Sequence, residues 1–130
     1  MASILRVNTL TDASSNNSTA MSTINQGTAK AWINLNGTGT IAARDSFNVG
    51  SLTDNGTGEY TLNYSSSMGN DDYSSQTTAD SGSGLIATLA TEGTMTTTAT
   101  KTTTYNSSIS PTDHAVVCCL LYTSPSPRDS

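Results

Sequence analysis

The stretch KAWINLNGTGTIAARDSFNVGSLTDNGTGEYTLNY, residues 30–64, alternates apolar and polar residues between short clusters of turn residues. Strict alternation over a short run predicts a strand with one buried and one exposed face. Residues 30–36 and 59–64 both show this pattern. The apolar members on one side of each run are Ala31, Ile33, Leu35, Tyr60, Leu62 and Tyr64. These two runs therefore predict strands of an antiparallel sheet.

Residues 44–65 predict an antiparallel hairpin with one apolar face. In its first strand, Phe47 and Val49 are two residues apart and should share a face. In its second strand, Tyr60 and Leu62 point inward by the same rule. We expect the strand around Phe47 to pair with the strand around Tyr60 and Leu62.

The sequence TDNGTGE, residues 53–59, supports this hairpin. An Asn-Gly pair accepts positive φ at both central positions of a type I′ turn, so we expect Asn55 and Gly56 to form the tip. Asp54, Asn55 and Glu59 also resemble part of a calcium loop, but the other ligands that such a loop requires are absent. The turn is the favoured interpretation.

The N-terminal residues 1–29 predict a short strand and a polar linker. SILRVNTL, residues 3–10, alternates and predicts the strand, and residues 11–19 lack apolar anchors and predict the linker. Residues 20–30 fit either one helical turn or irregular chain.

The second half of the chain predicts further strands. Residues 65–84 have the composition of a loop in which Tyr73 could serve as an anchor. Residues 85–93 fit a strand or a short helix, and we favour the strand. Residues 94–108 are Thr-rich and predict a strand, since β-branched side chains favour extended chain. Residues 114–122, HAVVCCLLY, predict the last strand.

The composition agrees with an all-β fold. Thr, Ser, Asn and Gly make up half of the 130 residues, and only 34% are hydrophobic. Thr favours strands, whereas Gly and Asn favour turns. About seven short strands separated by turns predict a small antiparallel β-sandwich or jelly-roll-like domain over residues 30–118.

The charge balance and hydropathy of the chain argue against two classes of function, nucleic-acid binding and membrane insertion. Five basic and ten acidic residues give a net charge of −5, and so few cations could not follow a phosphate backbone. No apolar run approaches the length of a membrane span. Arg6 interrupts the short apolar run at the N-terminus, which argues against a signal peptide. We expect no nucleic-acid partner, no membrane insertion and synthesis in a cytosol.

The sequence assigns no catalytic, cofactor-binding or metal-ligating residue. His114 is the sole histidine and follows Asp113, and we interpret it as a polar residue at the start of the last strand. Cys118 and Cys119 are adjacent, which is poor geometry for a shared zinc ion. The two aspartates of GNDDYS have the context of a solvated loop. A polysaccharide-cutting enzyme would need paired carboxylates, and no spacing supports a pair.

Residues 29–64 also resemble small tail-fibre-like and other virion-associated structural proteins of tailed bacteriophages, especially marine ones. The pattern runs through "AWINLNGTG", "ARDSFNV" and "TDNGTGEYTLN". The matching residues are Trp32, Asn36, Gly37, Arg44, Asp45, Phe47, Asn48, Val49, Asp54, Asn55, Gly56, Gly58, Tyr60 and Asn63. With the similar opening SILRVNTLTD, the resemblance covers about half of the chain. It implies a structural role on the virion, assembly as a homotrimer and no catalytic residues.

The C-terminal sequence CLLYTSPSPRD, Cys119–Asp129, is similar to one translated reading frame of a transposase-type sequencing adapter. We therefore expect residues 119–130 to be a non-native tail in which Thr123–Ser130 is disordered or lies in arbitrary contact. On this interpretation Cys119 is not native, although Leu120–Tyr122 could still extend the last strand.

Taken together, these features predict a non-enzymatic virion protein, a tail-fibre or appendage module without cofactors. Its expected partners are other copies of itself, other virion proteins and a glycan of the host surface. The alternative is a carbohydrate- or calcium-binding module of the adhesin type.

Overall fold

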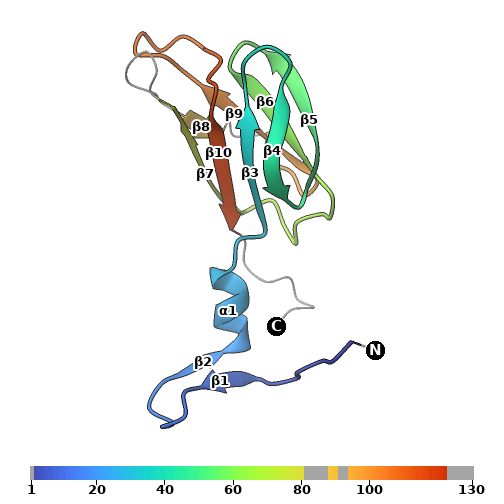
Figure 1. The fold of residues 1–130 in the computed structure, drawn as a ribbon, viewed down its shortest axis with the longest axis vertical. Helices are drawn as coiled ribbons and strands as arrows, with labels where there is room; N and C mark the ends of the chain where they lie inside the picture. Colours follow the sequence, from blue (N-terminus) through green and yellow to red (C-terminus); the bar gives the residue numbers. More distant parts are fainter. Residues whose placement is uncertain (1, 81–87, 91–93, 123–130) are drawn as a thin grey trace.

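The computed structural model describes residues 2–80, 88–90 and 94–122. In that part of the chain, ten strands and one short helix form an N-terminal unit followed by a sandwich of two antiparallel sheets (Figure 1). The all-β antiparallel fold class predicted from the sequence is confirmed. The prediction of disorder for Thr123–Ser130 lies outside the described residues.

The N-terminal unit contains β1 (Thr9–Thr11), β2 (Ser18–Ala20) and α1 (Met21–Gly27). β1 and β2 pair antiparallel, and α1 leads from β2 into the sandwich. The prediction of a strand over residues 3–10 is therefore wrong in its bounds, since pairing starts only at Thr9. The predicted polar linker is the connection of a small hairpin, in which the Asp12 carboxylate accepts the Asn16 N–H and the Asn17 side chain.

Each sheet of the sandwich has four strands within the described residues. The first sheet has the order β4-β3-β10-β7 and the second has the order β5-β6-β9-β8. The strands of the first sheet are β3 (Ala31–Asn36), β4 (Ala42–Phe47), β7 (Ser74–Ala79) and β10 (Val117–Tyr122). Those of the second are β5 (Val49–Gly56), β6 (Glu59–Tyr64), β8 (Thr88–Ala90) and β9 (Ala99–Thr104). The edge strands β4 and β5 lie on the same side of the sandwich, and β7 and β8 lie on the other (Figure 1).

The core lies between the two sheets and follows the alternation of the sequence. Every second residue of β3 and β10 is buried, and β6 buries Tyr60 and Leu62. The buried apolar residues are Ala31, Ile33, Leu35, Tyr60, Leu62, Met68, Tyr73, Val117, Cys119 and Leu121. Thr100, Thr102 and Thr104 of the Thr-rich β9 are buried as well. Each large apolar side chain buried in this way contributes about 1.5–3 kcal/mol.

The chain changes sheets at Asn48. This residue has a φ of 57°, a left-handed conformation that Asn tolerates better than most residues. Its Nδ2 donates to the Lys30 and Ser66 carbonyls at 3.1 and 3.0 Å, and its Oδ1 accepts the Ser66 N–H at 2.7 Å. The prediction that Phe47 and Val49 share one strand face is therefore wrong. Phe47 ends β4 in the first sheet, and Val49 begins β5 in the second.

β5 and β6 form a hairpin, but its tip lies two residues beyond the predicted one. Gly56 pairs with Glu59, so Thr57 and Gly58 form the two-residue turn. Asn55 is the extra residue of a bulge that shifts the register before the turn. The expectation that Asn55 and Gly56 form the tip is wrong, because the bulge displaces the turn toward Gly58, whose φ is 71°.

Among the described residues of the second half of the chain, one strand was missed by the sequence interpretation. β7 lies within residues 65–84, which were expected to form a loop, and its polar sequence SSQTTA carries no apolar alternation. Tyr73 is an anchor as expected, because its ring is buried against Tyr64 in an edge-to-face contact. The last strand, β10, runs through residue 118 and continues to Tyr122, with Leu121 fully buried.

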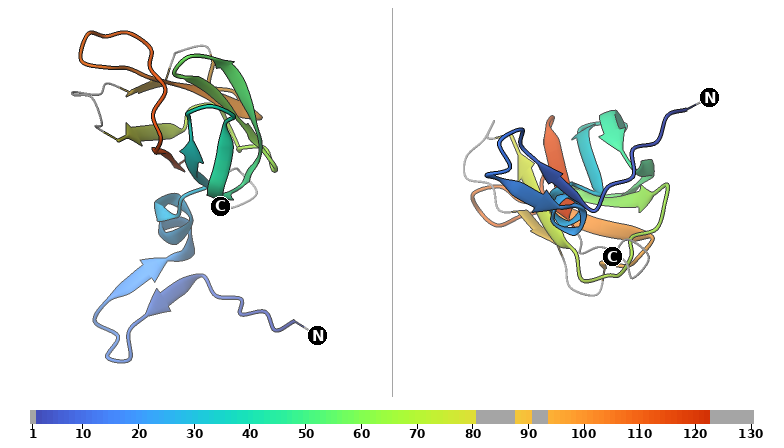
Figure 2. Two further views of the ribbon diagram at one scale, coloured as in Figure 1. Left: turned by 45° about the horizontal axis from the view of Figure 1, so that its top comes forward. Right: turned by 90° about the horizontal axis from the view of Figure 1, so that it is seen from below.

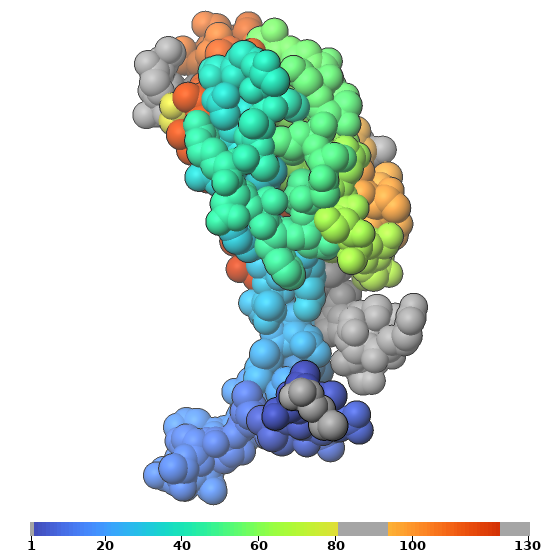
Figure 3. Space-filling view, turned by 45° about the vertical axis from the view of Figure 1, so that its right-hand side comes forward, coloured from blue at the N-terminus to red at the C-terminus, as the bar shows by residue number. Residues whose placement is uncertain are grey.

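The N-terminal unit projects from one end of the sandwich (Figures 1 and 2). Its residues 2–20 are exposed, and α1 buries none of its side chains. Figure 3 shows this unit as a narrow stalk below the wider sandwich. Within the described part of the chain, no helix is long and apolar enough to cross a membrane.

Candidate functional site

The outer face of the first sheet carries a row of large apolar side chains. Trp32 lies opposite Phe47 of β4 on one side and opposite Leu120 of β10 on the other, and Leu120 lies opposite Gln76 of β7. The strand neighbours of Trp32 and Leu120 are core residues, so alternation places the row on the outer face. Phe47 is 53% exposed. We call Phe47, Trp32 and Leu120 the aromatic row, after its two aromatic members.

A polar row runs beside the aromatic row, at positions two residues away on each strand. It consists of Asp45, Asn34, Cys118 and Thr78, which pair across β4, β3, β10 and β7. A carboxylate, an amide and a hydroxyl therefore lie next to an apolar surface. This combination suits a ligand that has both apolar faces and hydroxyl groups.

Arg44 holds the backbone below the polar row. It is the extra residue of a bulge, since Asn34 pairs with Asp45 and Leu35 pairs with Ala43. Its guanidinium donates to the Asn34 Oδ1 at 3.2 Å and to the Leu35 carbonyl at 2.8 Å. It also donates to the Ala115 carbonyl in the loop before β10. Arg44 thus joins three segments and fixes the acceptor end of the Asn34 amide.

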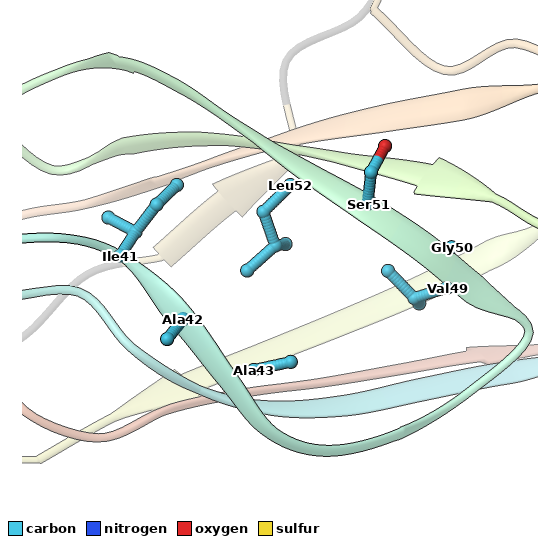
Figure 4. Close-up of a pocket in the computed structure, with 7 residues that line it drawn as sticks. All are labelled: Ile41, Ala42, Ala43, Val49, Gly50, Ser51 and Leu52. Atoms are coloured by element: carbon cyan, nitrogen blue, oxygen red, sulfur yellow. The ribbon is translucent and has the colours of Figure 1, made fainter.

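A hollow of about 260 Å³ lies between the edge strands β4 and β5. Residues 41–43 and 49–52 line it, and none of them is titratable. The side chains of Ile41, Val49 and Leu52 point toward the space between the strands (Figure 4). Both strands that border this hollow carry bulges. Bulged edges discourage the addition of another strand.

Asp113 and His114, the adjacent pair considered as catalysts, have separate structural contacts. The Asp113 carboxylate accepts the Gly58 N–H at 2.7 Å and lies 3.0 Å from the Tyr60 hydroxyl. The His114 ring is only 6% exposed, and its Nδ1 lies 3.4 Å from the carboxylate of Asp80. His114 precedes β10 by three residues, so it lies in the loop and not at the start of the strand.

The hydroxyl group of Tyr60 lies against this loop, next to the Asp113 carboxylate. Burial raises its pKa to about 12, with a smaller contribution from the hydrogen bond and charge of Asp113. The same hydroxyl lies 3.1 Å from the carbonyl of Gly37. Gly37 has no side chain because a Cβ there would collide with the Tyr60 ring and hydroxyl. The arrangement keeps Tyr60 protonated as a structural donor.

The two cysteines face opposite sides of β10. Cys119 is in the core, where burial raises its pKa to about 11, and its sulfur lies 3.2 Å from the Thr77 hydroxyl. Cys118 is half-buried in the polar row. Because their side chains diverge, the pair cannot bind one metal ion together. Among the described residues, no group of three or more His, Cys, Asp or Glu side chains converges on a metal site.

The side chains of residues 53–59 that were considered as calcium ligands make contacts within the protein instead. Asp54 accepts the Gly56 N–H at 3.0 Å, and Asn55 donates to the Thr61 hydroxyl at 2.7 Å. Glu59 forms an ion pair of 2.8 Å with Lys101. These side chains stabilise the hairpin, and their carboxylates do not converge.

The residues that match the tail-fibre-like pattern fall into two groups: some stabilise the fold, and others lie on the outer surface. Gly37, Asn48, Gly58 and Tyr60 stabilise turns, the change of sheet and the core. Trp32, Asp45 and Phe47 come together in the two rows on the outer face. The alternation in residues 30–36 correctly predicted that Trp32 lies on the face opposite the core. The predicted hairpin wrongly assigned Phe47 to the sheet that contains Tyr60 and Leu62. The sequence carries no local signal for the observed placement of Phe47, because the left-handed conformation of Asn48, at which the chain changes sheets, is seen only in the structure.

Comparison with known proteins finds no matching family model, no matching curated protein and no matching solved structure.

Proposed function

We propose that this chain is a non-enzymatic structural protein of a phage virion, a tail-fibre or appendage module. The observation that carries the proposal is the division into an exposed N-terminal unit and a β-sandwich head. A unit that buries almost none of its side chains within its own chain suits attachment to other subunits. The resemblance of residues 29–64 to tail-fibre-like proteins supports the same function.

The proposed partners are other copies of this chain, arranged as a homotrimer, and other virion proteins. The apolar side chains of Ile4, Leu5, Val7 and Leu10 are all exposed in the N-terminal unit, and Leu5 is 79% exposed. Exposed apolar residues gathered on one segment are typical of a contact surface. In this arrangement the N-terminal unit mounts the module, and the sandwich faces outward toward the host surface. The proposed location is the virion, after assembly in the host cytoplasm.

Labelling of virus particles tests this function. An antibody raised against the purified protein should bind the appendages of particles from the virus population that encodes it, as seen by immunogold electron microscopy. Mass spectrometry of the same purified particles should detect peptides from the sandwich. Absence of the chain from particles that carry their other structural proteins would contradict the proposal.

The alternative is a carbohydrate-binding module of the adhesin type, which acts outside a virion. The aromatic row beside the polar row favours carbohydrate over calcium as its ligand, because the candidate calcium ligands are engaged in the hairpin. Both functions can use the same face of the sandwich. They differ in whether the chain is found in virus particles.

A further inference from the structure

We propose that the outer face of the first sheet is a binding site for a neutral glycan, which stacks on Trp32 and Phe47 and bonds to the polar row. This inference rests on the proposed function, because it specifies how the sandwich would contact a host surface. It adds the site, its residues and the chemical class of the ligand.

The geometry of the aromatic row fits a chain of sugar rings. Trp32 pairs directly with Phe47 across two neighbouring strands and with Leu120 across the next pair. Neighbouring strands lie about 4.8 Å apart, which is close to the length of one pyranose ring. The row therefore offers adjacent apolar surfaces to the apolar faces of consecutive rings. Because Leu120 lies in the segment that resembles adapter sequence, the proposal rests on Trp32 and Phe47.

The polar row supplies partners for sugar hydroxyls. Asp45 contributes its carboxylate as an acceptor, one oxygen of which already accepts the Ser46 N–H at 2.9 Å, and Thr78 contributes a hydroxyl. The Oδ1 of Asn34 accepts from Arg44, and none of the hydrogen bonds found among the described residues uses the two amide protons of this side chain. Asn34 therefore presents donors beside the acceptors of Asp45. Such pairs match the alternating donor and acceptor character of a sugar hydroxyl.

The charges favour a neutral ligand over an acidic one. Arg44 is a cation that contacts the polar row, and its guanidinium already donates to Asn34, Leu35 and Ala115. Asp45 is exposed and would repel a second carboxylate or a sulfate. The chain as a whole carries a net charge of −5. A neutral polyhydroxylated ligand meets none of this repulsion.

The aromatic row is small for an interface between two copies of the chain. A stable protein interface buries about 800 Å² on each partner, drawn from about 20–30 residues. Here the row has three members, of which Phe47 is more than half exposed, while Trp32 and Leu120 are half-buried. An oligosaccharide needs far less area, since a few stacked rings and a few hydrogen bonds suffice.

The site is held in place before a ligand arrives. Its side chains are on paired strands, Arg44 fixes the bulge, and Asn48 fixes the backbone directly after Phe47. A preformed surface loses little conformational entropy on binding. This rigidity strengthens the interpretation of Phe47 as a contact residue, because an exposed aromatic ring on a fixed strand has no core to fill.

The single Trp makes the site directly measurable. The chain has one Trp, so intrinsic Trp fluorescence reports on Trp32 alone. The full-length protein would be titrated with maltohexaose, cellohexaose, N-acetylchitohexaose, mannohexaose and a galactan hexasaccharide, with oligogalacturonate as the acidic comparison. We expect a saturable change with at least one neutral oligosaccharide and tighter binding of that ligand than of oligogalacturonate.

The matched variants are Phe47→Ala and Ile109→Ala. Both remove an exposed apolar side chain, but Ile109 is 77% exposed in the loop between β9 and β10. Phe47→Ala should weaken binding about fivefold or more, because it removes one of the two stacking surfaces. Ile109→Ala should bind as the parent does. Circular dichroism of both variants verifies that each is folded.

Two results would overturn the glycan site. One is the lack of a saturable response to any neutral member of the panel. The other is equal binding by the Phe47→Ala variant and the parent. If Phe47→Ala instead lowers the oligomeric state in analytical ultracentrifugation while no glycan binds, the face is an interface between copies. None of these results changes where the chain is found in virus particles, so the proposed function is tested separately.

Discussion

Asn48 is the residue on which the arrangement of the two sheets depends most. Its backbone takes a left-handed turn, and its amide bonds to two segments that flank it in space, at Lys30 and Ser66. The short side chain of Asn combines tolerance of this conformation with the ability to make these bonds. Glycine would keep the first property and lose the second.

The pair Asn48→Gly and Asn48→Ala separates these two contributions. Asn48→Gly should lower the free energy of unfolding by about 1–3 kcal/mol, since it removes hydrogen bonds worth about 1 kcal/mol each. Asn48→Ala should lower it by about 1 kcal/mol more, because alanine in the left-handed region is strained. Urea denaturation measures both. Equal losses in the two variants would show that the backbone at residue 48 is unstrained.

Tyr60 and Cys119 predict a loss of stability at alkaline pH. The pKa of Cys119 is raised from 9.0 to about 11, and that of Tyr60 from 10.0 to about 12, mainly by burial. Both groups stay protonated in the fold but release protons earlier in the unfolded chain. Their contribution is therefore unchanged below about pH 9 and falls as the pH rises toward 12, by up to about 1.4 kcal/mol per pH unit for each group.

Thermal melts at intervals between pH 7 and pH 11 check this dependence. Cys119→Ala should be less stable than the parent at pH 7, and its stability should fall less steeply between pH 9 and pH 10. The same slope in parent and variant over that interval would contradict the role of the Cys119 thiol.

The β5–β6 hairpin shows how an element is fixed by contacts beyond its own sequence. At Gly58 a Cβ would lie 2.5 Å from the Thr112 nitrogen and 2.6 Å from the Thr104 oxygen, which are backbone atoms. At Gly56 a Cβ would meet nothing within 4 Å, although its φ of 129° is also unfavourable for other residues. The turn therefore packs tightly at Gly58 and is open at Gly56.

Gly58→Ala and Gly56→Ala should differ in stability for this reason. Gly56→Ala should cost about 1–3 kcal/mol from backbone strain alone. Gly58→Ala adds a collision with backbone that cannot move aside, so it should destabilise the protein more. Chemical denaturation of the two variants provides the comparison. A larger loss at Gly56 would place the tip of the hairpin at Asn55 and Gly56 after all.

The elements that could be predicted from the sequence are those whose burial alternates. β3 and β10 bury every second residue and β6 buries Tyr60 and Leu62, so the apolar periodicity of these strands is visible in the sequence. β7 is not visible, because SSQTTA is polar on both faces and pairs as an edge strand of its sheet. The turn at Thr57 and Gly58 was missed because a stronger local signal, Asn55-Gly56, is absorbed by a bulge.

The candidate site was partly visible in the sequence for a related reason. Alternation separated Trp32 from the core side of its strand, but no local rule could place Phe47 beside it. That neighbour depends on a pairing between β3 and β4 and on the end of β4 at Asn48. The polar row depends on the same pairing and on β7 and β10.

At the scale of the whole molecule, the exposed N-terminal unit predicts self-association. Light scattering of the full chain should report a trimer at micromolar concentration. Replacing Ile4, Leu5 and Val7 by Ser removes exposed apolar surface without touching the sandwich, so it should shift the protein toward monomer and leave its melting temperature nearly unchanged. A stable, folded monomer of the parent protein would contradict this prediction.

The sandwich and its outer face both depend on the change of sheet at Asn48, which brings Phe47 beside Trp32. Because the chain has one Phe and one Trp, a nuclear Overhauser spectrum can assign contacts between these rings without ambiguity. Directly opposed residues in an antiparallel pair have Cα atoms about 4.5–5.5 Å apart, so we expect strong cross-peaks between the Phe47 ring and the Trp32 indole. Cross-peaks from Phe47 to Tyr60 and Leu62, without any to Trp32, would show that β4 continues into the hairpin and would contradict both the fold and the site.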